Sequence, residues 1–260
     1  MPVFAANLTM MFNEWPFLDR FDAAADAGFS AVEYLFPYDA APEALAERLE
    51  RNRLQQALFN LPPGDWAAGE RGIAALPGRF DELRSGVDRA LEYAAATGAK
   101  KLHLMAGIAD PAEPEARSRY GQSVTYTAER LAEKGIELML EPINARNMPG
   151  YFLNDFNNAV AIIKELELPN LKLQFDIYHR QIMHGDVTVA LRELMAMIGH
   201  IQIASVPSRH EPEREELNYT WVFDEIDRLG YQGFVGCEYN PRGATLDGLG
   251  WFKPYARTLP

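Results

Sequence analysis

The sequence predicts an α/β fold, a single (β/α)8 TIM barrel domain over residues 1–260. Short apolar runs alternate eight times with longer runs of helical periodicity, and parallel strands require such helical crossovers. The length of 260 residues also fits a barrel of about 250 residues. A doubly wound open sheet uses the same alternation and is the alternative fold.

The predicted strands are short apolar runs that end at glycine, proline or a polar residue. We expect them at residues 3–8, 31–36, 54–60, 100–106, 136–143, 171–177, 200–206 and 233–239. In the sixth run Leu173 and Phe175 share one face, while Gln174 and Asp176 share the other. The side chain of Asp176 therefore points where that of Leu173 does not.

The predicted helices lie between these strands. We expect them at residues 17–28, 42–53, 80–98, 111–134 (after an initial loop), 154–168, 187–198 and 221–229. Phe17 and Phe21 recur at helical spacing, and Gly28 ends that helix. Pro42 suits a first helical turn, where its missing N–H would have no partner. Asn154 is the expected N-cap of its helix.

The longest irregular segment follows the third strand, with the sequence LPPGDWAAGERGIAALPGR at residues 61–79. Four glycines interrupt it, and Trp66 and Ile73 lie among them. A loop of this length in a compact domain is usually either functional or disordered. Because it carries large apolar side chains, we expect it to fold over another part of the molecule as a lid.

Composition limits the partners. The formal charge is −12 and the pI is near 4.9, which disfavours nucleic acid and anionic membranes. An anionic substrate would need a local cation in this field. A single cysteine excludes internal disulfides, and no apolar run reaches the roughly 18 residues of a membrane span. With no basic leader at the start of the sequence, we expect a soluble, cytoplasmic protein.

Four oxygen-bearing side chains stand at or near the carboxyl ends of successive predicted strands. They are Glu141, Asp176, Gln202 and Glu238, from strands five to eight. Barrel enzymes place their active sites at this rim, so we expect the four to share one site. The three carboxylates would repel one another without a cation, and oxygen ligands favour Mg²⁺ or Mn²⁺. The alternative is that each acid caps a helix or pairs with an arginine.

Five further residues are candidates for substrate binding. His179 follows Asp176 on the loop after strand six, and Arg209 follows strand seven, where its planar guanidinium suits a substrate carboxylate. His103 lies inside strand four, either as a substrate contact or as a buried, hydrogen-bonded histidine. Asn60 ends strand three, and Trp66 lies in the predicted lid.

Other chemistries find little support. His200 opens the seventh predicted strand at the end far from the rim, so we interpret it as structural. Cys237 lies inside an apolar strand beside an acid, which raises the pKa of a thiol and argues against a nucleophile. The glycines at 64, 69 and 72 do not join a strand to a helix, as a phosphate-binding loop would.

These segments together resemble the hydroxypyruvate isomerase family of the xylose-isomerase-like barrel superfamily. The resemblance runs from about Phe4 to Tyr255, through ANLTMMF, EYLFPYD, FNLPPGDWAAGERGIAALPGR, LEPIN, QFDIYH, GHIQIA, RHEP, NY and GCEYNPRG. The related 2-oxo-tetronate isomerases share the first motif, ALPGR, RHEP and GCEY, but NLPPGDWAAGERG, EPIN and DIYH look more like the hydroxypyruvate group.

The resemblance implies a metal site on Glu141, Asp176, Gln202 and Glu238, with Glu141 and Glu238 as proton donor and acceptor. Related ketose epimerases carry a histidine as third ligand, so Gln202 departs from the wider superfamily. The implied reaction interconverts hydroxypyruvate and 2-hydroxy-3-oxopropanoate (tartronate semialdehyde) through an enediolate. His179 and Arg209 would hold substrate oxygens.

Several alternatives stay open at this point. A 2-oxo-tetronate isomerase or ketose 3-epimerase would use the same site on a longer substrate, and a non-catalytic sugar-acid binding protein would use it without turnover. The superfamily also contains zinc-dependent apurinic endonucleases with histidine-rich sites, but five scattered histidines and a charge of −12 disfavour that activity. Exposed aromatics, Trp66 and Trp251, would permit a homo-oligomer.

Overall fold

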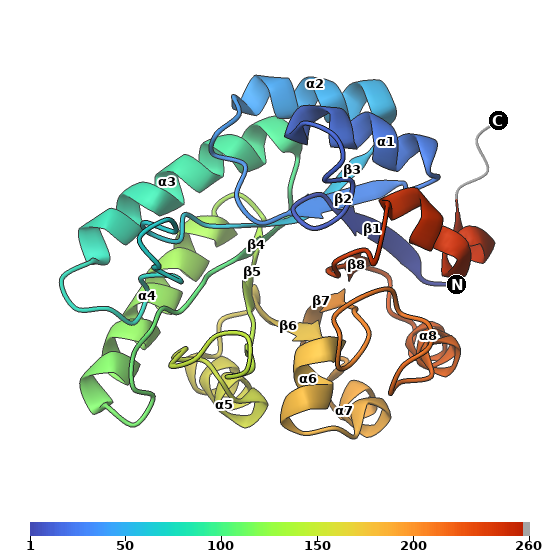
Figure 1. The fold of residues 1–260 in the computed structure, drawn as a ribbon. Helices are drawn as coiled ribbons and strands as arrows, with labels where there is room; N and C mark the ends of the chain where they lie inside the picture. The colour runs from blue at the N-terminus through green and yellow to red at the C-terminus, as the bar shows by residue number, and fades with distance from the viewer. Residues whose placement is uncertain (257–260) are drawn as a thin grey trace.

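The computed structural model describes residues 1–256, and its eight strands close into a parallel barrel in which β1 pairs with β8 (Figure 1). The strands are β1 Val3–Asn7, β2 Ala31–Tyr34, β3 Gln55–Asn60, β4 Lys101–His103, β5 Glu137–Leu140, β6 Leu171–Asp176, β7 Ile198–Gln202 and β8 Phe234–Cys237. The predicted (β/α)8 barrel is confirmed, and the doubly wound alternative is wrong because that sheet would stay open.

Helices surround the barrel and cover its outer face (Figure 1). The α-helices are α1 Arg20–Asp26, α2 Pro42–Asn52, α3 Phe80–Thr97, α4 Pro114–Ala132, α5 Phe156–Leu166, α6 Ile177–Met183, α7 Val187–Leu194 and α8 Tyr219–Arg228. The 3-10 helices are η1 Phe17–Asp19, η2 Thr245–Trp251 and η3 Lys253–Tyr255. Each long helix buries one apolar stripe: in α3, Leu83, Val87 and Ala90 recur at helical spacing and are buried.

Two boundaries differ from the sequence prediction in ways that affect the site. Strand β7 begins at Ile198, so His200 lies in its middle, not at the end far from the rim as predicted. Helix α6 begins at Ile177, where a loop was predicted, because the Asp176 side chain caps its first turn. The cap of α5 is Asp155, not Asn154; its carboxylate accepts from the Asn158 N–H at 3.1 Å.

The barrel interior holds a buried polar layer around Glu33 of β2. Its carboxylate contacts the His200 Nε2 at 2.6 Å and accepts from the side-chain amides of Gln202 at 2.9 Å and Asn7 at 3.0 Å. Strand β2 pairs only with β1 and β3, so contacts to β7 must cross the interior. Gly236 of β8 provides the space that the Glu33 side chain occupies, because a Cβ at position 236 would lie 2.2 Å from the Glu33 carboxylate.

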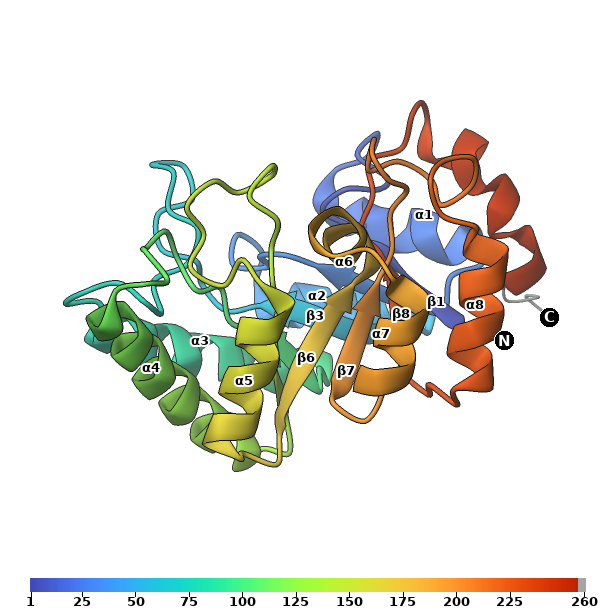
Figure 2. The ribbon, with the colours of Figure 1, turned by 90° about the horizontal axis from the view of Figure 1, so that it is seen from below.

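The loops that leave the carboxyl ends of the strands gather on one side of the barrel (Figure 2). The predicted lid, residues 61–79, contains no helix or strand, but its second half is anchored: Gly72 bridges Ala106, and Ile73 is buried. A Cβ on Gly72 would meet the Met105 carbonyl oxygen at 2.3 Å, so only glycine fits there.

Of the two aromatics predicted to be exposed, only Trp66 is, with 38% of its surface accessible. Trp251 packs instead, with its ring 5.1 Å from that of Phe4 and its Nε1 donating to the Tyr239 hydroxyl at 3.3 Å. This corrects the prediction that Trp251 is an exposed tail residue. Within residues 1–256, no helix combines the length and apolarity that crossing a membrane would require.

Candidate active site

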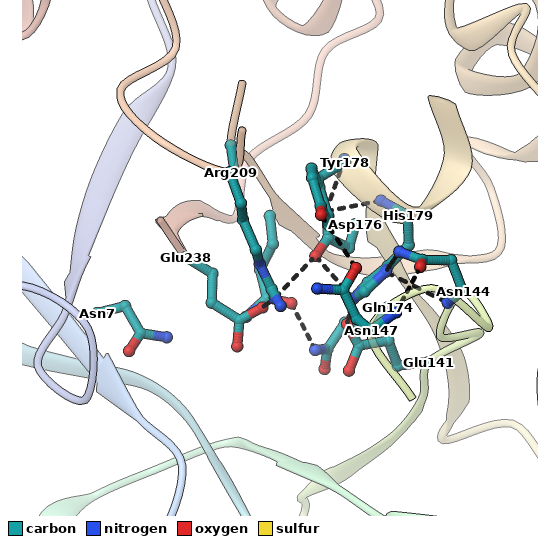
Figure 3. Close-up of polar contacts among 12 residues, drawn as sticks. Asn7, Glu141, Asn144, Asn147, Gln174, Asp176, Tyr178, His179, Arg209 and Glu238 are labelled. Atoms are coloured by element: carbon teal, nitrogen blue, oxygen red, sulfur yellow. Dashed lines mark hydrogen bonds and ion pairs between the residues drawn. The ribbon is translucent and has the colours of Figure 1, made fainter. Parts of the chain in front are cut away.

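Three carboxylates converge at the rim of the barrel, from the ends of β5, β6 and β8. Glu141 and Glu238 directly follow β5 and β8, and Asp176 is the last residue of β6. One ligand atom from each, together with one from His179, all lie within 4.8 Å of one another (Figure 3). All four side chains are buried.

The two carboxylate oxygens of Asp176 have different roles: one caps helix α6 and the other faces the site. Its Oδ1 accepts from the backbone N–H groups of Tyr178 at 2.7 Å and His179 at 3.4 Å, so this carboxylate caps a helix, as the alternative prediction has it. Its Oδ2 is buried without a hydrogen-bond partner and lies 3.5 Å from the His179 Nε2. Capping therefore orients the carboxylate and leaves one oxygen facing the site.

His179 is held by Asn144 in one orientation. The backbone N–H of Asn144 donates to its Nδ1 at 3.3 Å, and the side-chain amide lies 2.6 Å from the same atom. A backbone N–H can only donate, so Nδ1 is the acceptor and Nε2 carries the proton of the neutral ring. Burial lowers the pKa of His179 well below its usual value, so the ring is neutral. Nε2 therefore presents an N–H between Glu141 and Asp176.

Arg209 supplies the positive charge nearest to the acids. Its Nη2 donates to Glu238 Oε2 at 2.6 Å and lies 3.9 Å from Asp176 Oδ2 (Figure 3). The guanidinium also lies over the Tyr178 ring, with its carbon 5.0 Å from the centroid. Burial alone would lower the pKa of Arg209, but the neighbouring acids raise it, so the residue is a permanent cation.

The carboxylates are costly to ionise in this setting. Burial, followed by repulsion from Glu238 and Asp176, raises the pKa of Glu141 well above its usual value. Burial raises the pKa of Glu238 to about 8, although Arg209 opposes the shift, and burial raises that of Asp176 as well. One arginine thus does not neutralise the cluster, and part of it takes up protons unless a further cation binds.

The residues fit a divalent cation. Glu141 Oε1 and Asp176 Oδ2 are buried oxygens without hydrogen-bond partners, and carboxylate oxygens are the ligands that hard cations prefer. A buried cluster that can hold a metal is therefore present. Gln202, level with Asp176 in the sheet, donates to Glu33, and its Oε1 accepts from Gln174 at 2.6 Å.

A cavity of about 290 Å³ opens onto Glu141 and Glu238. All of the predicted substrate-binding residues line it: Asn60, Trp66, His103, His179 and Arg209. The His103 Nδ1 lies 3.6 Å from Glu141 Oε2, and burial lowers the pKa of this histidine to about 3. His103 is buried, as the alternative prediction has it, but neither of its ring nitrogens has a hydrogen-bond partner, so it lines the cavity as a neutral residue without the predicted hydrogen bonds.

Other residues of the site were not predicted. Asn147 and Met148 follow Asn144 in the loop after β5, and Arg71 reaches the cavity from the lid. The sequence did hold a signal for Glu33 of the buried polar layer, because a glutamate interrupts the apolar run AVEYLF. No comparable signal marked Arg71, which lies in a segment without periodicity.

Comparisons with known proteins agree with this architecture. Residues 21–255 match the family described as "Xylose isomerase-like TIM barrel". The 2-oxo-tetronate isomerase of Cupriavidus necator is 55% identical, over 98% of this chain and 99% of that protein. The hydroxypyruvate isomerase of Escherichia coli is 44% identical, over 97% and 98%. A crystal structure described as an AP endonuclease, family 2, from Brucella melitensis is 51% identical, with a TM-score of 0.96 and coverage of 98% and 100%.

Proposed function

Because the chain belongs to the xylose isomerase-like TIM barrel family, we propose that it is an isomerase of short hydroxy-oxo acids. The specific reaction interconverts hydroxypyruvate and 2-hydroxy-3-oxopropanoate. The hydroxypyruvate isomerase of Escherichia coli, similar over nearly the whole chain, supports this choice. The observation that carries it is the convergence of Glu141, which follows β5, and Glu238, which follows β8, on one small cavity.

Two carboxylates suit this chemistry because the reaction moves a proton between neighbouring carbons. One acid removes a proton from C3 of hydroxypyruvate, which leaves an enediolate. The hydroxyl proton of C3 passes to the C2 oxygen, and the second acid delivers a proton to C2. Atoms and charge balance without an external oxidant. Each general acid–base step is typically worth about 10²–10⁴-fold in rate. We assign these roles to Glu141 and Glu238.

The neighbouring residues bind and orient the substrate oxygens. His179 donates from Nε2 to the oxygen on which negative charge develops, and Asn144 fixes this tautomer. Arg209 holds Glu238 in place and offers its remaining N–H groups to the substrate. His103, Asn60 and Trp66 complete the walls.

We propose Glu141, Asp176, Gln202 and Glu238 as the ligands of a divalent cation, Mg²⁺ or Mn²⁺. When bound, such a cation would supply positive charge that stabilises the anionic enediolate. His179 lies close enough to be a ligand, but its Nε2 carries the proton and Nδ1 faces the Asn144 N–H. The oxygen-only set is therefore the better proposal.

A 2-oxo-tetronate isomerase is the second candidate, favoured by the 55% identity to the Cupriavidus necator protein of that name. Its substrate is longer by one carbon but carries the same carboxylate and carbonyl. Initial rates on hydroxypyruvate, both 2-oxo-tetronates and free ketoses, each with Mg²⁺, Mn²⁺ or a chelator, separate the candidates. Ligand-induced thermal stabilisation without turnover of any substrate would replace the proposal with a binding function.

The name of the Brucella melitensis structure points to nucleic acid instead. A charge of −12 opposes binding to a polyanion, and a cavity of about 290 Å³ suits a small molecule. Incubation with an abasic-site duplex in the same metal buffers tests this alternative. We expect no cleavage.

A further inference from the structure

Arg71 brings a second cation to the cavity from the lid. It lines the same space as Glu141, His179 and Arg209, yet it comes from the loop between β3 and α3. Its guanidinium carbon lies 3.9 Å from the centroid of the Trp66 ring, which also lines the cavity. The Trp66 ring in turn packs on Phe36 at 5.0 Å, so the arginine rests on a supported aromatic surface.

The hydrogen bonds of Arg71 leave one edge of its guanidinium available. Nη1 donates to the backbone oxygens of Trp66 at 3.2 Å and Glu70 at 2.8 Å. Within residues 1–256, Nε and Nη2 have no protein partner, and no carboxylate lies within ion-pair distance of the side chain. An Nε–Nη2 edge matches the two oxygens of a carboxylate. The side chain is thus held at one nitrogen and presents a fork at the other two.

Charge gives this fork a function. The acids of the site repel an anionic substrate, and Arg209 is already committed to Glu238 at 2.6 Å. A substrate carboxylate that took Arg209 in a two-point contact would compete with that bond. Arg71 has no such competitor, and stacking on Trp66 fixes its direction at a low entropic cost.

We infer that Arg71 is the residue that binds the substrate carboxylate and selects anionic hydroxy-oxo acids over neutral sugars. This inference rests on the proposed function for its substrate class. It assigns Arg209 to Glu238 and the reacting oxygens, and it gives the lid a chemical role: Trp66 and Arg71 close over the carboxylate end of the substrate as one unit.

Two inert probes test the subsite directly by calorimetry on the full chain in Mg²⁺. D-glycerate and glycerol differ only by a carboxylate in place of a hydroxymethyl group, and neither has a carbonyl to isomerise. We expect the wild-type protein to prefer glycerate. Arg71→Gln should weaken glycerate binding about 10- to 100-fold, the usual scale for a charge-assisted contact, and leave glycerol within about threefold. Arg71→Lys should retain part of the preference.

Arg51→Gln is the matched control, because Arg51 is an exposed arginine of α2 that pairs with Asp22 and does not line the cavity. We expect it to change binding of the two probes by the same factor. The inference is overturned if Arg71→Gln keeps wild-type glycerate affinity, if Arg51→Gln loses the preference equally, or if the wild-type protein shows no preference.

Kinetics on hydroxypyruvate separate this inference from the proposed function. For Arg71→Gln we expect a KM at least tenfold higher, with kcat reduced by a smaller factor. Turnover that is insensitive to Arg71 would keep the reaction and reject the subsite. Arg71-dependent glycerate binding without turnover of any 2-oxo acid would keep the subsite and reject the reaction.

Discussion

The Nδ1 atom of His179 faces two N–H groups of Asn144, the backbone one at 3.3 Å and the side-chain one at 2.6 Å. The Asn147 N–H donates to the Asn144 side-chain oxygen at 3.0 Å, so the amide cannot turn its oxygen toward the ring without losing that bond. This relationship makes His179 a hydrogen-bond donor at Nε2. It therefore distinguishes His179 from the carboxylates around it, which are the proposed metal ligands.

His179→Gln should therefore lower kcat about 10²-fold, because one donor to the developing anion is lost, and leave Mn²⁺ affinity within about threefold. Calorimetric titration with Mn²⁺ and steady-state kinetics measure the two effects. Asp176→Asn is the comparison variant and should weaken Mn²⁺ binding more than about tenfold. Loss of Mn²⁺ binding in His179→Gln would make the histidine a ligand.

Glu33 is the centre of the buried polar layer, where it accepts from Asn7 and Gln202 and contacts His200. Glu33→Gln replaces one carboxylate oxygen, an acceptor, with an NH₂ group that faces these donors. The change should lower the free energy of unfolding by about 1–3 kcal/mol, since a buried donor loses its acceptor. Chemical denaturation measures this cost. The exposed Glu43→Gln on α2 is the control and should change stability by less than about 0.5 kcal/mol.

Glu33→Gln should also weaken Mn²⁺ binding about 10- to 100-fold, as expected when a residue that orients a ligand is changed, because Glu33 holds the Gln202 amide in place. Calorimetry at a temperature where the variant is folded separates this effect from stability. Unchanged Mn²⁺ affinity would mean either that Gln202 is not a metal ligand or that Glu33 does not orient it.

The lid should loosen in acid. The Arg79 side chain, followed by the Asp65 N–H, holds the pKa of Glu70 at about 2 in the folded chain. A lowered pKa means that this anchor is fully present above the ordinary value of 4.5 and is lost as pH falls toward 2. Tryptophan fluorescence and limited proteolysis between about pH 5 and 2 follow the lid. Glu70→Gln should abolish that pH dependence; an unchanged profile would contradict the anchor.

Removal of divalent cations should reduce thermal stability. A cation that binds only the folded chain raises stability by about 2.7 kcal/mol at 100 times its Kd. Melting curves with a chelator, and after Mg²⁺ or Mn²⁺ is restored, measure this shift. Asp176→Asn should show little response to metal, and a wild-type curve that does not move would argue against a bound cation.

The sequence predicted the features that depend on strand periodicity. Glu141 and Glu238 follow apolar runs directly, and because parallel strands end at one rim, their convergence could be inferred from order alone. The additional helix α6 escaped prediction because Asp176 ends a strand and caps a helix with the same residue. The predicted N-cap of α5, Asn154, is one position away from the actual cap, Asp155, which is a common error at the ends of helices.

What the sequence could not predict depends on contacts across the barrel or from loops. Glu33 meets His200 only because β2 and β7 face each other through the interior. Arg71 enters the cavity because Gly72 lets the lid pack against the Met105 backbone, a tertiary contact that leaves no periodic signature.

Isomerisation of hydroxypyruvate in D₂O, followed by proton NMR, tests the central claim most directly. The proton removed from C3 stays on one acid and a solvent-exchanged proton reaches C2 from the other, so the product should carry deuterium at C2. Glu141→Gln and Glu238→Gln should each lower turnover by about 10²–10⁴-fold. Turnover without deuterium at C2, or either variant at near wild-type rate, would contradict the account.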